Sequence, residues 1–167
     1  MRAPTDEDLD AAARRLGRAL AGRGWQMAAA ESCTGGLVGH VITQVPRSSD
    51  HFLGGIVSYS NDAKEQLLDV SADLIESVGA VSAEVAEAMT TGALARFPAA
   101  RLALAVTGIA GPDGGSDDKP VGLTYVAGAV RDGPAVVERH TWPHDRDGNK
   151  RASALAAIEL ATRLSRE

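Results

Sequence analysis

The sequence predicts an α/β fold of three layers, with helices on both faces of a mixed, mostly parallel sheet and a late antiparallel hairpin. Stretches with apolar residues at helical spacing alternate with short apolar stretches for most of the 167 residues. The stretch 102–106 is continuously apolar, as expected for a strand buried on both faces of a sheet. Two strand-like stretches, 122–130 and 135–141, are joined by Arg-Asp-Gly-Pro, which predicts the hairpin.

The chain begins with a predicted helix, strand and helix. Thr5, followed by three acidic residues, favours the start of a helix that Gly22 and Gly24 end. A strand is expected over 25–30. A polar, glycine-rich turn separates it from a helix that begins near Leu37.

A second strand over 52–60 leads into a short helix over 62–68, for which Asn61 is the expected N-cap. Lys64 then lies in the first turn of that helix. A cation is disfavoured there by the helix dipole, and such local inconsistencies are common at functional sites. A solvated surface lysine is the alternative interpretation.

The remaining elements complete the alternation of helices and strands. The stretch 69–79 predicts a loop and a short helix, and Ser82 caps a longer helix that Pro98 ends. A long Gly-rich loop, 107–120, follows the buried strand, and loops of this length within a domain are usually functional or disordered. The closing helix is expected over 145–166.

Composition narrows the class of protein. The length suits one domain, 1–167, and 44% hydrophobic with 4% aromatic residues predicts a core of small aliphatic side chains. The net charge of −5 and scattered basic residues disfavour nucleic acid as a partner. One cysteine and four histidines show no zinc-like spacing, so neither a metal nor a cofactor is expected. No secretory or membrane-spanning stretch appears, which favours a cytoplasmic protein without a membrane partner.

Three polar segments follow three predicted strands: 32–36, 59–64 and 107–119. Ligands in α/β sheets bind beyond the carboxyl ends of the strands, so we expect one site built from these segments. In the first segment a hydroxyl, Ser32 or Thr34, would cap the next helix, and the glycines would let an anion or oxyanion approach free backbone N–H groups. Capping alone is the plainer alternative. Neither the Walker A nor the Rossmann glycine pattern occurs in the long loop.

Four motifs then resemble a known family, in the same order and over nearly the whole chain. They are Ala-Glu-Ser-Cys-Thr-Gly-Gly at 30–36, Ser-Tyr-Ser-Asn-x-x-Lys at 58–64, Gly-Ala-Val-Ser at 79–82, and Val-Thr-Gly-Ile-Ala-Gly-Pro-x-Gly-Gly with Lys-Pro-Val-Gly at 106–122. The chain resembles the CinA C-terminal family, the nicotinamide-nucleotide amidohydrolases. The resemblance implies metal-free hydrolysis of nicotinamide mononucleotide to nicotinate mononucleotide and ammonia in pyridine-nucleotide salvage. It also implies an α/β/α fold and a homo-oligomer, a dimer or larger. A molybdopterin-binding-like domain precedes this unit in longer members, and we expect it to be absent here.

The resemblance also implies roles for particular residues. Ser32 matches the proposed nucleophile and Lys64 the base, whose pKa must fall from ~10.4 toward ~7, a difference of roughly 4–5 kcal/mol. Desolvation and the helix N-terminus both act in that direction. Tyr59 is expected at the catalytic centre.

The other expected site residues would bind substrate. The backbone N–H groups of Thr34, Gly35 and Gly36 are candidates for either the oxyanion or the substrate phosphate. Asn61, Thr107 and Gly108 are expected to orient Lys64 or the ribosyl pyridine, and Arg146 matches a family arginine.

Several alternatives stay open. Cys33 is a rival nucleophile, although a small buried cysteine is the more ordinary role. The four histidines are expected to be structural or on the surface, with His144 the one that could reach the pocket. A non-catalytic module that binds a pyridine nucleotide or a partner protein is the alternative function.

The chain departs from the family pattern at two places. Where the family commonly has Pro-Gly-Ser-Ser, this chain has Arg47 in place of the glycine. Lys150 replaces the second arginine of the usual Gly-Asp-Arg-x-x-x-Arg. Because lysine lacks the planar fork of arginine, phosphate affinity or subunit contacts would change.

Overall fold

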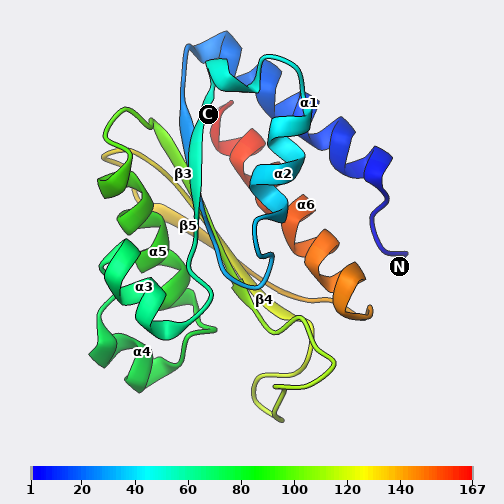
Figure 1. Ribbon diagram of the computed structural model, residues 1–167, viewed down its shortest axis with the longest axis vertical. Helices are drawn as coiled ribbons and strands as arrows, with labels where there is room; N and C mark the ends of the chain where they lie inside the picture. The colour runs from blue at the N-terminus through cyan, green and yellow to red at the C-terminus, as the bar shows by residue number, and fades with distance from the viewer. Residues whose placement is uncertain (1, 167) are drawn as a thin grey trace.

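A five-stranded sheet separates two layers of helices in the computed structural model, which describes residues 2–166 (Figure 1). The strand order is β2-β1-β3-β4-β5. β1 pairs in parallel with β2 and β3, whereas β3–β4 and β4–β5 are antiparallel, so four of the five strands point the same way. The predicted fold class and late hairpin are confirmed. The strands are β1 (Met27–Glu31), β2 (Phe52–Val57), β3 (Leu102–Gly108), β4 (Leu123–Val130) and β5 (Ala135–Thr141).

The helices divide evenly between the two faces of the sheet (Figure 1). One face is covered by α1 (Asp6–Arg23), α2 (Leu37–Gln44) and α6 (Arg146–Leu164). The other is covered by α3 (Asn61–Leu68), α4 (Ala72–Val78) and α5 (Ala83–Arg96). A short 3-10 turn, Ser48–Asp50, precedes β2.

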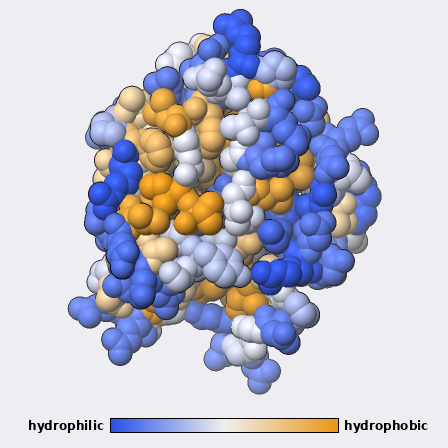
Figure 2. Space-filling model, viewed as in Figure 1, coloured by the Kyte–Doolittle hydropathy of each residue, from blue (hydrophilic) through white to orange (hydrophobic). Residues whose placement is uncertain are grey.

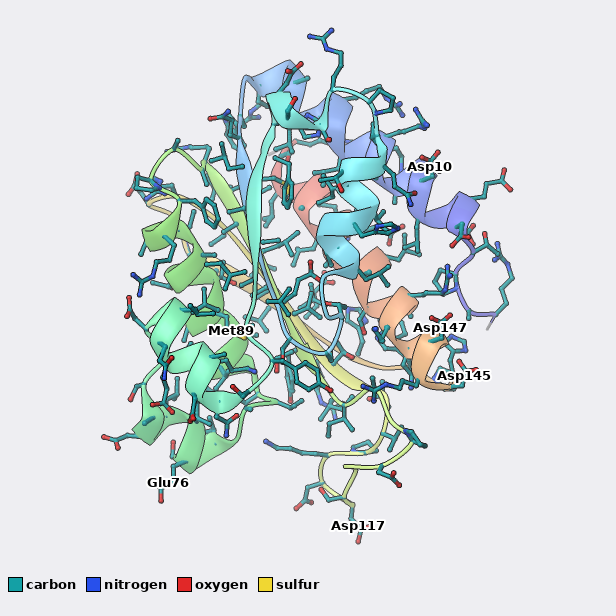
Figure 3. The ribbon with its side chains drawn as sticks, in the orientation of Figure 1. Asp10, Glu76, Met89, Asp117, Asp145 and Asp147 are labelled. Carbon is teal, nitrogen blue, oxygen red and sulfur yellow. The ribbon has the colours of Figure 1, made fainter. Side chains whose placement is uncertain are left out.

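Side chains alternate across β3 and make the two cores different. Leu102, Leu104 and Val106 face the core beneath α1, α2 and α6. Ala103 and Ala105 face the core beneath α5. Met89 of α5, labelled in Figure 3, is fully buried in this second core. The small strand side chains therefore leave room for bulkier side chains of α5.

The capping residues in the sequence predicted most helix ends correctly. Thr5 and Asp8 form a reciprocal capping box at the start of α1, and Gly24 ends that helix in the left-handed conformation, while Gly22 lies inside it. The expected cap of α3 was wrong by one residue. Ser60 is extended and its hydroxyl accepts the N–H of Ala63, so Asn61 is the first helical residue.

The carboxyl ends of β1, β2, β3 and β5 meet at one end of the sheet because these strands share a direction. The chain continues from them into the Ser32 turn, the segment before α3, the loop 109–122 and the segment before α6. β2 is shorter than expected and ends at Val57. These connections build the candidate site.

Candidate active site

Ser32 and Lys64 are 32 positions apart in the chain, and their side chains meet. Ser32 directly follows β1, and its N–H donates to the carbonyl of Val106 in β3 at 3.0 Å. Lys64 projects from the first turn of α3, and its Nζ lies 2.9 Å from Ser32 Oγ. Ser32 is 6% exposed and Lys64 is 1% exposed. The contact is therefore buried, and the alternative of a solvated surface lysine is wrong.

Two backbone carbonyls complete the surroundings of Lys64 Nζ. The amine donates to Ser58 O at 2.8 Å and to Tyr59 O at 3.2 Å. Lys64 forms no ion pair within residues 2–166, and burial lowers the pKa of its ammonium group. A neutral amine can donate both N–H groups to these carbonyls while its lone pair accepts the hydroxyl proton of Ser32. The arrangement can thus remove a proton from Ser32.

Cys33 lies beside this pair but is poorly suited to attack a substrate. Burial raises the pKa of its thiol to about 12, so the thiol stays protonated near neutral pH. The amine of Lys64 contacts Ser32 and not Cys33 within hydrogen-bonding distance. Geometry and charge therefore favour the serine over its rival.

Glu31 corrects the expectation for the glycine-rich turn. Its buried carboxylate accepts the N–H groups of Gly36, Val38 and Gly39 at 3.0, 3.1 and 2.9 Å. No hydroxyl caps α2, so the prediction that Ser32 or Thr34 would do so is wrong. Glu31 takes the place that an external anion would occupy at this helix N-terminus.

Two of the three backbone N–H groups that were expected to bind an anion already donate hydrogen bonds within the chain. Gly36 donates to Glu31, and Gly35 donates to the carbonyl of Ser32 at 3.0 Å. Within residues 2–166, the N–H groups of Cys33 and Thr34 have no acceptor. Of the three predicted amides, only that of Thr34 stays free, and Cys33 supplies a second that was not predicted.

A cavity of about 270 Å³ opens over the Ser32–Lys64 pair. Six of the predicted site residues line it: Ser32, Tyr59, Lys64, Thr107, Gly108 and Arg146. The other four do not line it: Thr34, Gly35, Gly36 and Asn61. Thr34 is fully buried beneath the turn, and Asn61 is exposed on α3 because the chain turns into the helix one residue earlier than expected.

Tyr59 and Arg146 form the outer edge of the cavity. Arg146 donates to Gly111 O at 2.6 Å and to the hydroxyl of Tyr59 at 3.2 Å. It begins α6 between Asp145 and Asp147, both labelled in Figure 3. Tyr59 is 62% exposed, so its ring meets solvent at the rim.

Thr107 and Gly108 shape the floor of the cavity. The hydroxyl of Thr107 donates to the carbonyl oxygen of Ala80 at 2.8 Å, and Ala80 also lines the cavity. A side chain at position 108 would bring its Cβ within 2.7 Å of Thr124 Oγ1 and 3.1 Å of Cys33 Sγ. Only glycine fits there without displacing its neighbours.

Two residues that sequence reasoning did not assign hold the loop 109–122. Lys119 Nζ donates to Val78 O at 2.6 Å and to Val81 O at 2.9 Å. Asn149 of α6 donates to Ala110 O at 3.0 Å. Lys119 is part of the Lys-Pro-Val-Gly motif and Asn149 is next to Lys150, but only the folded arrangement identifies their partners. Asp117, labelled in Figure 3, lies in the same loop and is exposed.

No histidine lines the cavity, and His144 faces other hollows of the surface. Within residues 2–166 no group of His, Cys, Asp and Glu is arranged to hold a metal ion. Among the same residues, no helix has both the length and the apolar character needed to cross a membrane.

The chain matches the CinA C-terminal domain over residues 9–165. It is 48% identical over 158 residues to a CinA-like protein of Geobacter sulfurreducens, covering 95% of this chain and 37% of that protein. It is 51% identical over 156 residues to a CinA-like protein of Desulfotalea psychrophila, covering 93% of this chain and 37% of that protein. The chain thus spans a little over a third of the length of these curated relatives.

Solved structures give the same result. The competence/damage inducible protein CihA of Agrobacterium tumefaciens superposes with a TM-score of 0.90 at 37% identity, covering 98% of both chains. A CinA superfamily protein of Klebsiella pneumoniae superposes with a TM-score of 0.89 at 30% identity, covering 94% of this chain and 97% of that one. Sequence and fold together show that the chain belongs to the CinA C-terminal domain family.

Proposed function

We propose that this protein is an amidohydrolase that converts nicotinamide mononucleotide into nicotinate mononucleotide and ammonia. The observation that carries the proposal is the 2.9 Å contact between Lys64 Nζ and Ser32 Oγ inside a lined cavity. A protein that only binds nucleotides has little need for a buried lysine without a carboxylate partner, because burying an unpaired ammonium is costly. A base with a lowered pKa is what an amidohydrolase requires.

In the proposed first step, Ser32 Oγ bonds to the carboxamide carbon while its proton moves to the lone pair of Lys64 Nζ. The carbonyl electron pair moves to oxygen, and the free N–H groups of Cys33 and Thr34 are the candidate donors to that oxyanion. The C–N bond then breaks as the Lys64 ammonium protonates the leaving nitrogen, which departs as ammonia. An ester on Ser32 remains.

Water completes the proposed cycle. It attacks the ester carbon while neutral Lys64 accepts one of its protons, and the carboxylic acid product leaves as the proton returns to Ser32. The carbonyls of Ser58 and Tyr59 fix the amine in both steps, because they accept its N–H groups and leave its lone pair toward Ser32.

Family membership and the rim of the cavity support a mononucleotide as the substrate class. Arg146 presents a guanidinium group at the opening, and such a group binds phosphate through two parallel hydrogen bonds. The exposed ring of Tyr59 can cover an aromatic ligand beside it.

The proposal includes a homo-oligomer in the cytoplasm, as the family resemblance implies. Apolar residues gather near the centre of the face in Figure 2, over β2. β2 is an edge strand, and Val57 at its end is 46% exposed. An exposed edge with apolar side chains favours association with a second copy. Light scattering of the purified protein tests this part.

Ammonia release from nicotinamide mononucleotide tests the chemistry. We expect Ser32→Ala and Lys64→Ala each to lower kcat by at least about 1,000-fold, the scale of losing a nucleophile or its base. Cys33→Ala is the matched control in the same turn and should retain activity. Activity that survives Ser32→Ala but disappears in Cys33→Ala would transfer the nucleophile to the thiol. Binding of the nucleotide without ammonia release by the parent protein would favour the non-catalytic module.

A further inference from the structure

A second hollow lies at the opposite end of the sheet from Ser32. It has a volume of about 350 Å³ and is bounded by the second half of α1 and by the connection from α2 to β2. This connection contains the departure from the family pattern at position 47. The hollow shares no lining residue with the Ser32 cavity.

The charge of this hollow contrasts with that of the chain. Three arginines line it against one aspartate, although the protein as a whole carries −5. Arg14 and Arg47 each pair with a carboxylate close in sequence, whereas Arg18 forms no ion pair within residues 2–166. A larger hollow of about 450 Å³ beside β5 has the reverse balance, three carboxylates against two arginines. Of the three arginines, Arg18 is thus the one whose charge no carboxylate within residues 2–166 balances.

His51 supplies a buried polar group on the same wall. It is 6% exposed, and its ring packs so closely on Gly17 of α1 that a Cβ there would lie 3.1 Å from His51 Cε1. Within residues 2–166 the imidazole donates and accepts no hydrogen bond. His51 lines the hollow, and its ring nitrogens have no protein partner within residues 2–166, so they are available to a ligand that enters it.

Arg47 adds to this interpretation through its backbone. Its φ of 68° is in the left-handed region that favours glycine. The chain keeps an arginine there, and its guanidinium group reaches Asp50 at the rim. The strained residue thus places a guanidinium group, paired with Asp50, at the rim of the hollow.

We propose that this hollow is an anion site that binds a phosphoryl group among Arg14, Arg18, Arg47 and the imidazole of His51. Guanidinium groups bind phosphate through charge-assisted hydrogen bonds, and a neutral imidazole adds one N–H donor. The phosphoryl group comes either from free phosphate or from a small nucleotide. The site does not depend on the proposed amidohydrolase reaction.

Proton–carbon NMR of the histidine Cε1–H groups tests the proposal, with the His51 signal assigned by its absence in His51→Gln. Inorganic phosphate and adenosine 5′-monophosphate are titrated separately at constant ionic strength. Adenosine serves as the ligand without phosphate. We expect the His51 signal to shift saturably with at least one phosphate ligand and not with adenosine. A tighter response to the nucleotide identifies a nucleotide site, and an equal or tighter response to phosphate identifies a free-phosphate site.

A matched pair of variants completes the test. Arg18→Gln should weaken the phosphate response about tenfold, the scale of one charge-assisted hydrogen bond. Arg139→Gln removes the same charge from an exposed residue of β5 and should leave the response unchanged. The proposal is overturned if the His51 signal does not saturate, or if Arg139→Gln weakens the response as much as Arg18→Gln does.

Discussion

Two helix N-termini point toward the candidate site, and they differ in the ionisable side chain that lies at each. α2 follows β1, and its first N–H groups are held by the carboxylate of Glu31. α3 follows the neighbouring strand β2, is capped by the hydroxyl of Ser60, and contains Lys64 in its first turn. One helix start thus receives a carboxylate from the chain itself, and the other contains a basic side chain.

The difference separates a supporting group from a reactive group. A helix N-terminus carries partial positive charge, so it stabilises the carboxylate of Glu31 and disfavours the ammonium of Lys64. Burial acts on Lys64 in the same direction. Glu31 therefore keeps the Ser32 turn in one conformation, while Lys64 is favoured in the neutral form that can accept a proton.

Replacing Glu31 should have a larger effect on stability than removing the hydroxyl cap of α3. Glu31→Gln places an amide against the N–H groups of Gly36, Val38 and Gly39, and loses charged hydrogen bonds. We expect the free energy of unfolding to fall by roughly 3 kcal/mol. Urea denaturation measures it, and Glu84→Gln, an exposed acid in the first turn of α5, is the control. A loss no larger than that of the control would show that the carboxylate is unimportant at α2.

Replacing Lys64 should change how the stability of the protein depends on pH. Between its lowered pKa in the folded protein and about 10.4 in the unfolded chain, the unfolded state binds the extra proton, so the free energy of unfolding rises with pH. Lys64→Met lacks this contribution. The parent protein should therefore gain stability relative to the variant as pH rises, by about 1.4 kcal/mol per unit of pKa lowering.

Urea denaturation of both proteins from pH 7 upward checks this expectation. The titration of His51, whose pKa burial also lowers, cancels because both proteins contain it. A difference that is constant or shrinks with pH would mean that the pKa of Lys64 is not lowered.

Removing the cap of α3 should have the smallest effect. Ser60→Ala deletes the hydroxyl that accepts the N–H of Ala63 and should cost about 1 kcal/mol of stability. The backbone carbonyls that hold Lys64 remain, so ammonia release should change only slightly. Ser71→Ala removes the equivalent cap of α4, away from the site, and is the control for activity. A large loss of activity confined to Ser60→Ala would show that the cap also positions the amine.

The sequence was sufficient for the architecture and for the central pair. Alternating periodicities predicted the layers, and the family motifs predicted a pair of Ser32 and Lys64, whose side chains meet in the structure. Whether Ser60 or Asn61 caps α3 could not be predicted, because both side chains are good caps and the choice depends on where the chain bends. The hydrogen bonds from the first N–H groups of α2 to Glu31 could not be predicted either, because they depend on the direction in which the Glu31 side chain leaves β1.

Contacts between residues far apart in the sequence could not be predicted from local sequence patterns. Arg146 reaches Tyr59 over 87 positions because β5 runs in the same direction as β2, and the sequence does not specify that direction. Asn149 contacts the loop 109–122 for the same reason.

The anchors of that loop determine how a ligand reaches Ser32. Lys119 fastens one flank to the segment between α4 and α5, and Arg146 and Asn149 fasten the other to α6. These hydrogen bonds hold both flanks of the glycine-rich segment to the helices beside it. Tyr59 lines the cavity and its ring is exposed, so a ligand that reaches Ser32 passes close to this ring.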